Sequence, residues 1–151
     1  MKIAATQYSA NYGALEIFIS GCDGECGCDC HNRELWDFSV GEDYRNIVEK
    51  IEEKIKDFSN IINEIWITGG EPLLQDLGEL MDLVGRVHKM GKAMILFTRF
   101  EVEDIPKELL MYFDKVKSGK YEEGKVCKDH FSEGILLISE NQKILLRGRD
   151  Y

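Results

Sequence analysis

Apolar residues along this chain follow two spacings, one typical of buried strands and the other typical of amphipathic helices. Residues 15–20, 61–68 and 93–98 are short apolar runs, and we expect each of them to form a strand. Residues 43–58 and 77–90 place their apolar side chains three or four positions apart, which predicts two helices with charged outer faces. Strands and helices therefore alternate along this part of the chain.

Four further segments continue the pattern as a helix, a short strand and two apolar runs: residues 104–113, 116–121, 134–139 and 143–146. The alternation of strand and helix predicts a parallel sheet with right-handed crossovers and helices packed on it. The strands are too few for a complete eight-unit barrel, which needs roughly 200 residues or more. We therefore expect one α/β domain over residues 1–151, built as an incomplete TIM-like barrel of mostly parallel strands with flanking helices.

Charge and hydropathy narrow the classes of partner. The formal net charge of −9 argues against a nucleic-acid partner, because neutralising phosphates requires a basic face. No segment reaches the roughly 18 apolar residues of a membrane span, and the first residues do not resemble a targeting signal. We therefore expect a cytoplasmic protein with no membrane partner, in a compartment that keeps thiols reduced.

Four of the five cysteines crowd into the loop after the first predicted strand, at Cys22, Cys26, Cys28 and Cys30. Gaps of one or three residues suit disulfides poorly, so we expect these thiols to be metal ligands. They suit an iron–sulfur cluster, or a zinc ion held by the four thiolates or by three of them with His31. Structural zinc usually draws its ligands from two separated pairs, whereas every candidate here lies in one loop. That arrangement favours the iron–sulfur cluster.

A Gly-Gly-Glu-Pro run at residues 69–72 directly follows the second predicted strand. It suits a simple turn from strand to helix, because glycine relieves steric crowding and proline begins a helix well. It also suits a ligand site, because glycine lets the backbone approach a ligand while Glu71 faces a cationic group. Ligands of parallel sheets collect at the carboxyl ends of strands, where both this run and the cysteine loop are expected. We therefore expect the two segments to form a single site.

Cysteines in a loop after the first strand, with Gly-Gly-Glu-Pro after the second, resemble the radical S-adenosylmethionine enzymes. The closer resemblance is to the small activating proteins of glycyl-radical enzymes, specifically those of the anaerobic ribonucleoside-triphosphate reductase. The resemblance spans nearly the whole chain. Its supporting segments are Gly21-Cys22, Cys30-His31-Asn32 with Trp36, Phe97-Thr98, Ser118-Gly119-Lys120-Tyr121-Glu122 and Ser139-Glu140-Asn141-Gln142-Lys143.

This chain departs from the pattern of that family at three places. The usual spacing between ligand cysteines is three residues and then two, whereas the second gap here is one residue to Cys28 or three to Cys30. We favour Cys30, because His31-Asn32 and Trp36 then keep their expected places, which leaves Cys28 as a spare or alternative ligand. The second departure is His31, which stands where an aromatic residue is common and would pack over the cluster in its stead, and the third is Arg99, which stands where a small residue is expected.

The resemblance implies a 4Fe-4S cluster and S-adenosylmethionine as cofactors, with the amino and carboxylate groups of the latter on the open iron. One electron from the cluster would cleave S-adenosylmethionine to methionine and a 5′-deoxyadenosyl radical, which abstracts hydrogen from a glycine of a partner anaerobic ribonucleotide reductase. A small reductant such as flavodoxin would supply the electron. The implied cluster ligands are Cys22, Cys26 and Cys30, and the implied cofactor-binding residues are Thr68, Gly69, Gly70, Glu71 and Asn141.

Other interpretations stay open at this point. Short radical S-adenosylmethionine proteins also make 7-deazaguanine precursors or activate other glycyl-radical enzymes, and a zinc-stabilised interaction module would need no catalysis. Residues 127–130, Cys-Lys-Asp-His, are at most half of a second metal site. The acidic residues Asp23, Glu25 and Asp29 place negative charge around the cysteines, where they either lower the reduction potential of a cluster or are simply solvated residues of the loop.

Overall fold

The computed structural model describes residues 1–27 and 30–151, so Cys28 and Asp29 lie outside the described residues. Its main sheet has seven strands: β1 (Lys2–Ser9), β2 (Ala14–Ile19), β3 (Glu42–Asp43), β4 (Glu64–Gly69), β5 (Ala93–Phe97), β6 (Lys115–Ser118) and β9 (Lys143–Leu146). Two more strands form a separate hairpin, β7 (Val126–Ser132) and β8 (Ile135–Ser139). The α-helices are α1 (Tyr44–Asp57), α2 (Leu77–His88) and α3 (Lys107–Leu110).

The sheet runs in the order β3-β1-β2-β4-β5-β6-β9. Its four central strands, β2, β4, β5 and β6, are parallel to one another, and the outer strands join them antiparallel. The expected α/β fold with a parallel centre and flanking helices is therefore confirmed. Within the part of the chain that the structure describes, the end strands β3 and β9 do not pair with each other, so the sheet is open.

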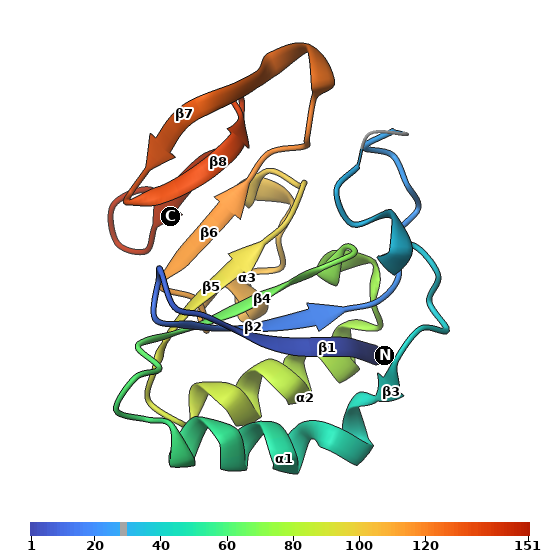
Figure 1. The fold of residues 1–151 in the computed structure, drawn as a ribbon, viewed down its shortest axis with the longest axis vertical. Coiled ribbons are helices and arrows are strands. Elements are labelled where there is room, and N and C mark those ends of the chain that lie inside the picture. The colour runs from blue at the N-terminus through green and yellow to red at the C-terminus, as the bar shows by residue number, and fades with distance from the viewer. Residues whose placement is uncertain (28–29) are drawn as a thin grey trace.

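Helices α1 and α2 cover one face of this sheet (Figure 1). Both begin with an aspartate cap, because Asp43 accepts a hydrogen bond from the Arg45 amide and Asp76 accepts one from the Glu79 amide. Each helix buries one apolar stripe against the central strands. The most buried side chains of the two stripes are Val48, Ile51, Ile55, Leu80, Leu83, Val84 and Val87. This layer is the main core, and both helices agree with the sequence prediction.

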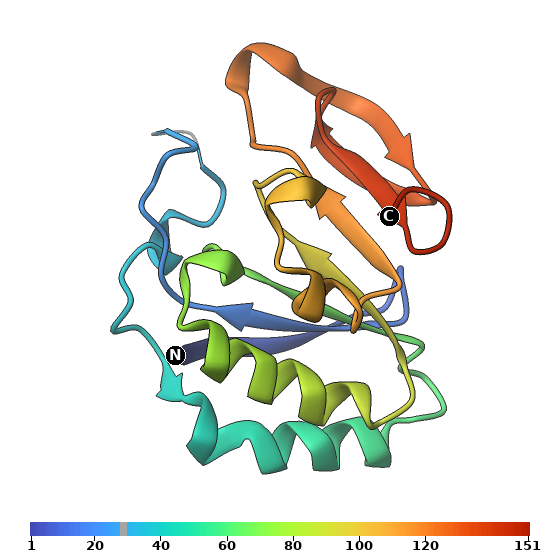
Figure 2. The ribbon, with the colours of Figure 1, turned by 180° about the vertical axis from the view of Figure 1, so that it is seen from behind.

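The β7–β8 hairpin lies on the side of the sheet away from α1 and α2 (Figures 1 and 2). A second, smaller core joins it to the sheet: Ala14, Trp66, Ile95, Ile135, Leu137 and Ile144. The Trp66 ring lies between two other aromatic rings, 4.9 Å from that of Tyr12 and 4.8 Å from that of Phe97. The hairpin therefore covers part of the face on which the barrel interior would lie.

Strands β1 and β7 are absent from the sequence prediction. Ile3 is the one fully buried side chain of β1, and no residue of β7 is fully buried. Strands with so little burial lack the apolar run or strict alternation by which strands are recognised. The helix expected over 104–113 is also shorter, because residues 102–104 form a 3-10 turn and α3 has only four residues. No helix among the described residues combines the length and apolar character needed to cross a membrane.

Candidate metal centre

The parallel pairing of β2 with β4 brings the cysteine loop beside the Gly-Gly-Glu turn. Ile19 lies opposite Gly69 in this pairing, so both chains leave the sheet at the same edge. Two backbone hydrogen bonds continue the contact beyond the strands. The Gly70 amide donates to the Ile19 carbonyl at 2.8 Å, and the Glu71 amide donates to the Gly21 carbonyl at 2.9 Å. The structure thus brings the two segments together at one edge.

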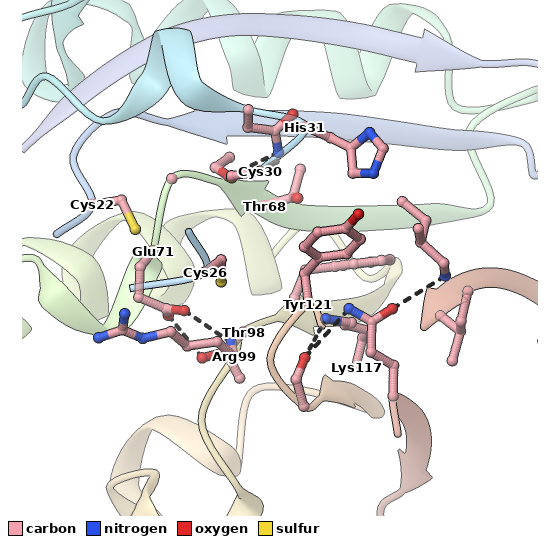
Figure 3. Close-up of a pocket in the computed structure, with 18 of the residues that line it drawn as sticks. Cys22, Cys26, Cys30, His31, Thr68, Glu71, Thr98, Arg99, Lys117 and Tyr121 are labelled. Atoms are coloured by element: carbon pink, nitrogen blue, oxygen red, sulfur yellow. Dashed lines mark hydrogen bonds between the residues drawn. The ribbon is translucent and has the colours of Figure 1, made fainter. Parts of the chain in front are cut away.

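A cavity of about 200 Å³ lies at this edge (Figure 3). Seven of the eight residues that the sequence singled out for the site line it: Cys22, Cys26, Cys30, Thr68, Gly69, Gly70 and Glu71. Asn141 does not line the cavity, whereas its neighbour Gln142 does. The Asn141 amide nitrogen instead donates to the Lys120 carbonyl at 2.7 Å, and its side-chain oxygen is buried without a protein partner.

Tight turns shape the cysteine loop. Gly24 and Gly27 adopt φ angles of 73° and 84°, in the left-handed region that favours glycine. The Gly27 amide donates to the Gly24 carbonyl, and the Cys30 amide donates to the Gly27 carbonyl at 3.2 Å. Beyond the cysteines, the Asn32 side-chain amide donates to the Gly69 carbonyl at 3.0 Å. Both ends of the loop are therefore attached to the strand end of β4.

Three cysteine side chains form the soft donor set of the cavity. The three described cysteines of the loop are partly exposed, and all of them line the same cavity. Among the described residues, no group of three or more Cys, His, Asp or Glu side chains is already arranged around one metal ion. Thiolates are ligands of both iron–sulfur clusters and zinc.

Glu71 is buried, with only 2% of its surface exposed. Its Oε1 accepts hydrogen bonds from the Leu73 amide at 3.0 Å and the Thr98 hydroxyl at 2.7 Å. Its Oε2 accepts one from the Arg99 amide at 2.9 Å. Burial raises the pKa of Glu71, although these three donors act in the opposite direction. The carboxylate therefore joins the turn after β4 to the end of β5, and Oε2 keeps acceptor capacity for a further donor.

The sequence prediction did not include Lys117, which lines the cavity from β6. In Figure 3 it lies with Tyr121 toward the end of the cavity away from Glu71 and Cys22. Its Nζ donates to the Gly119 carbonyl at 2.8 Å, and burial lowers the pKa of this lysine to about 8. The sequence prediction placed Lys117 near the beginning of a short strand over residues 116–121, whereas β6 ends at Ser118 and brings Lys117 close to the carboxyl end. Nearby, the His31 ring meets the Tyr121 ring edge-on at 5.1 Å.

Residues 127–130, the possible half of a second metal site, lie in β7 outside the cavity lining. The Nε2 atom of His130 is 2.8 Å from the Gln142 carbonyl oxygen, so this ring makes a structural contact between the hairpin and the turn before β9. Among the described residues no second group of metal-binding side chains forms here.

A family model for the 4Fe-4S single cluster domain matches residues 13–145 of the chain. The chain belongs to this family. The match includes the cysteine loop, the Gly-Gly-Glu turn and every strand of the parallel centre. No curated protein matches the chain. The 4Fe-4S single cluster domain therefore binds an iron–sulfur cluster, and the three cavity-facing thiols provide a donor set of the right chemistry.

Replacing Gly70 by alanine tests how closely the domain packs its two site segments. A Cβ at this position would lie 2.5 Å from the Gly21 carbonyl oxygen and 2.9 Å from the Leu35 carbonyl oxygen, both backbone atoms. We expect Gly70→Ala to lower the free energy of unfolding by about 1–3 kcal/mol, because this overpacking must move the cysteine loop. Urea denaturation of the metal-free protein measures the change.

The matched control is Gly85→Ala within α2, where the nearest atom to the new Cβ would be the Tyr112 hydroxyl oxygen at 3.7 Å. We expect this control to be neutral or to gain up to about 1 kcal/mol, because alanine favours a helix over glycine. Equal stabilities of the two variants would contradict close packing at Gly70.

Lys117 is expected to lower the free energy of unfolding of the metal-free protein near neutral pH. Its pKa of about 8 means that the folded protein holds this proton less tightly than the unfolded chain does. The free energy of unfolding should therefore rise as the pH increases from about 8 toward the ordinary lysine value near 10.4. Lys117→Met should raise the free energy of unfolding at pH 7 by about 1–3 kcal/mol and remove this pH dependence.

Urea titrations of the metal-free protein at pH 7 and pH 9.5 measure both effects. The control is Lys115→Met on the same strand. Lys115 donates to the Glu64 carboxylate at 2.7 Å, so this variant should lose stability rather than gain it. A destabilised Lys117→Met variant at pH 7 would overturn the prediction.

Proposed function

We propose that this 4Fe-4S single cluster domain is a radical S-adenosylmethionine activase that installs a glycyl radical on an anaerobic ribonucleotide reductase. One observation carries the proposal: three cysteines of one loop and the Gly-Gly-Glu turn of the adjacent parallel strand line the same cavity. A cluster site alone needs only the thiols. The buried Glu71 carboxylate beside them, whose Oε2 keeps acceptor capacity, supports a second ligand with a cationic group.

Cys22, Cys26 and Cys30 would hold the cluster, and their number is the basis of the chemistry. Three protein thiolates would leave one iron for the amino and carboxylate groups of S-adenosylmethionine, and the cluster, when bound, would supply the electron for cleavage to methionine and a 5′-deoxyadenosyl radical. The protein positions the ligand and excludes water.

Two side chains of opposite charge lie at different ends of the cavity. The Oε2 atom of Glu71 accepts one protein hydrogen bond and can accept another from the amino group of the ligand. The Lys117 ammonium has three N–H donors, of which one is used by the Gly119 carbonyl, so two remain for acceptors on the part of the ligand away from the cluster. Thr68 and the Gly69–Gly70 backbone also line the cavity and would contact the ligand.

The open sheet supports the entry of a partner segment. We propose that it acts as an incomplete TIM-like barrel whose unclosed side admits the glycine loop of the reductase. Leu136 and Ile138 of β8 line the cavity and remain 43% and 40% exposed, which provides an apolar rim for such a loop. A small reductant such as flavodoxin would deliver the electron in the reducing cytoplasm.

Cleavage of S-adenosylmethionine tests the proposal. The protein is reconstituted anaerobically with iron and sulfide, reduced with dithionite and mixed with S-adenosylmethionine. We expect 5′-deoxyadenosine and methionine in equal amounts by liquid chromatography and mass spectrometry. A cluster-loaded, reduced protein that forms no 5′-deoxyadenosine would refute the assignment.

A second measurement tests the target of the radical. Electron paramagnetic resonance after addition of an anaerobic ribonucleotide reductase should show a glycyl doublet. Cleavage of S-adenosylmethionine without this doublet would mean that the domain acts on another substrate, such as a different glycyl-radical enzyme or a 7-deazaguanine precursor.

A further inference from the structure

Arg99 connects the end of β5 to the cysteine loop. Its guanidinium donates to both carboxylate oxygens of Asp23, at 2.5 and 2.7 Å, and lies 3.5 Å from the carboxylate of Glu25 (Figure 3 shows its position in the cavity wall). Its backbone amide donates to Glu71, which follows β4. One residue therefore contacts both segments that form the site.

The geometry of the Arg99–Asp23 pair differs from that of an ordinary surface ion pair. Exposed pairs contribute little because solvent screens them and both side chains lose freedom. Here the Arg99 side chain is only 10% exposed, the contact is bidentate, and the guanidinium also lies 4.8 Å from the centre of the Phe100 ring.

The pair also reaches the first thiol of the loop. Asp23 follows Cys22 directly, and the Cys22 sulfur lies 3.8 Å from the Asp23 Oδ1 atom. The same Oδ1 atom accepts the Glu25 amide at 3.1 Å, which fixes the turn between Cys22 and Cys26. The position of the Arg99 guanidinium therefore fixes the position of the turn between Cys22 and Cys26.

The charges of Arg99, Asp23 and Glu25 also affect the reduction potential of a neighbouring cluster. Taken without partners, Asp23 and Glu25 would lower this potential, which is one of the interpretations that the sequence left open. Both carboxylates face the Arg99 guanidinium instead, so a cation lies between them beside the thiols. Reduction adds negative charge to a cluster, and a fixed cation nearby stabilises that charge.

We propose that Arg99 is a positioning residue that holds the cysteine loop against β5 and raises the reduction potential of the iron–sulfur cluster. The proposal depends on iron–sulfur binding, which the family shows, and not on the proposed cleavage of S-adenosylmethionine.

Two variants that remove charges of opposite sign separate the electrostatic role of Arg99 from a merely structural one. Arg99→Gln removes the cation and should lower the midpoint potential, whereas Asp23→Asn removes a neighbouring anion and should raise it. For each unit of charge we expect the ratio of reduced to oxidised cluster at a fixed potential to change about tenfold, which is about 59 mV for one electron. Anaerobic redox titrations of the reconstituted proteins, followed by electron paramagnetic resonance without S-adenosylmethionine, measure these shifts.

Arg99→Lys tests the positioning role. It keeps the charge but loses the bidentate contact. Its potential should stay near that of the wild type, while the release of iron to a chelator becomes several-fold faster. If Arg99→Gln cannot hold a cluster, that loss supports the positioning role and Asp23→Asn tests the electrostatic one, because an asparagine Oδ1 can still accept from the Arg99 guanidinium and the Glu25 amide.

Arg86→Gln is the matched control. Arg86 makes a bidentate pair with Glu52, at 2.8 and 2.9 Å, between α2 and α1 and outside the cavity lining. This variant should change neither the potential nor the release of iron. Shifts of the same sign in Arg99→Gln and Asp23→Asn, or potentials equal to that of Arg86→Gln, would overturn the proposal. Failure of S-adenosylmethionine cleavage would leave these potentials unaffected and would refute only the activase assignment.

Discussion

Replacing Cys22, Cys26 or Cys30 by alanine, one at a time, is expected to reduce iron and sulfide to background after anaerobic reconstitution. Each thiol lines the cavity, and a cluster held by three protein ligands loses its attachment when one of them is removed. The brown absorbance of the cluster and the formation of 5′-deoxyadenosine should disappear together. Iron and sulfide analysis of each purified variant, beside wild type treated in the same way, measures the effect.

Two further cysteine variants serve as a control and as a test of whether Cys28 or Cys30 is the third ligand. Cys127→Ala changes a thiol in β7 outside the cavity lining and should bind iron as wild type does. Cys28→Ala should also keep the cluster if Cys30 is the third ligand. Retention of iron by Cys30→Ala, together with its loss from Cys28→Ala, would reverse that assignment.

Replacing Glu71 by alanine is expected to have the largest effect on stability among the carboxylates of the site. The change leaves three donors without their acceptor: the Leu73 amide, the Thr98 hydroxyl and the Arg99 amide. Because a buried polar group left without a partner costs about 1–3 kcal/mol, we expect the free energy of unfolding to fall by at least about 2–4 kcal/mol. Urea denaturation of the metal-free protein measures the loss.

The control for this variant is Glu53→Ala on the outer face of α1, where the side chain is exposed. It should change the free energy of unfolding by less than about 0.5 kcal/mol, as surface substitutions usually do. A Glu71→Ala variant as stable as this control would show that the three hydrogen bonds contribute nothing to the join between β4 and β5.

The sequence was sufficient to predict the elements that carry a strong apolar pattern. Helices α1 and α2 and strands β2, β4 and β5 were expected near their observed positions, because each buries a continuous stripe or run. Parallel alternation then implied that the cysteine loop and the Gly-Gly-Glu turn share an edge. Strands β1 and β7 could not be found in this way, because most of their side chains are exposed or only partly buried.

The remaining site features depend on tertiary contacts that no local pattern encodes. Arg99 and Asp23 are 76 positions apart in the chain, so their pairing becomes visible only when β5 lies near the cysteine loop. The role of Lys117 is also visible only in the folded structure, because its lowered pKa comes from burial in the assembled cavity. Asn141 was expected in the site, yet its neighbour Gln142 lines the cavity. A difference of one position in a turn cannot be decided from composition.

The β7–β8 hairpin has a consequence for how proteins of this kind could diversify. It contributes Leu136, Leu137 and Ile138 to one wall of the cavity, yet it adds no strand to the main sheet. Its exposed side chains, such as Leu136 and Ile138, can therefore vary while Ile135 and Leu137 keep their packing against the parallel strands. Exchanging this hairpin between homologous domains offers a way to change which molecule reaches the metal while the metal-binding framework stays constant.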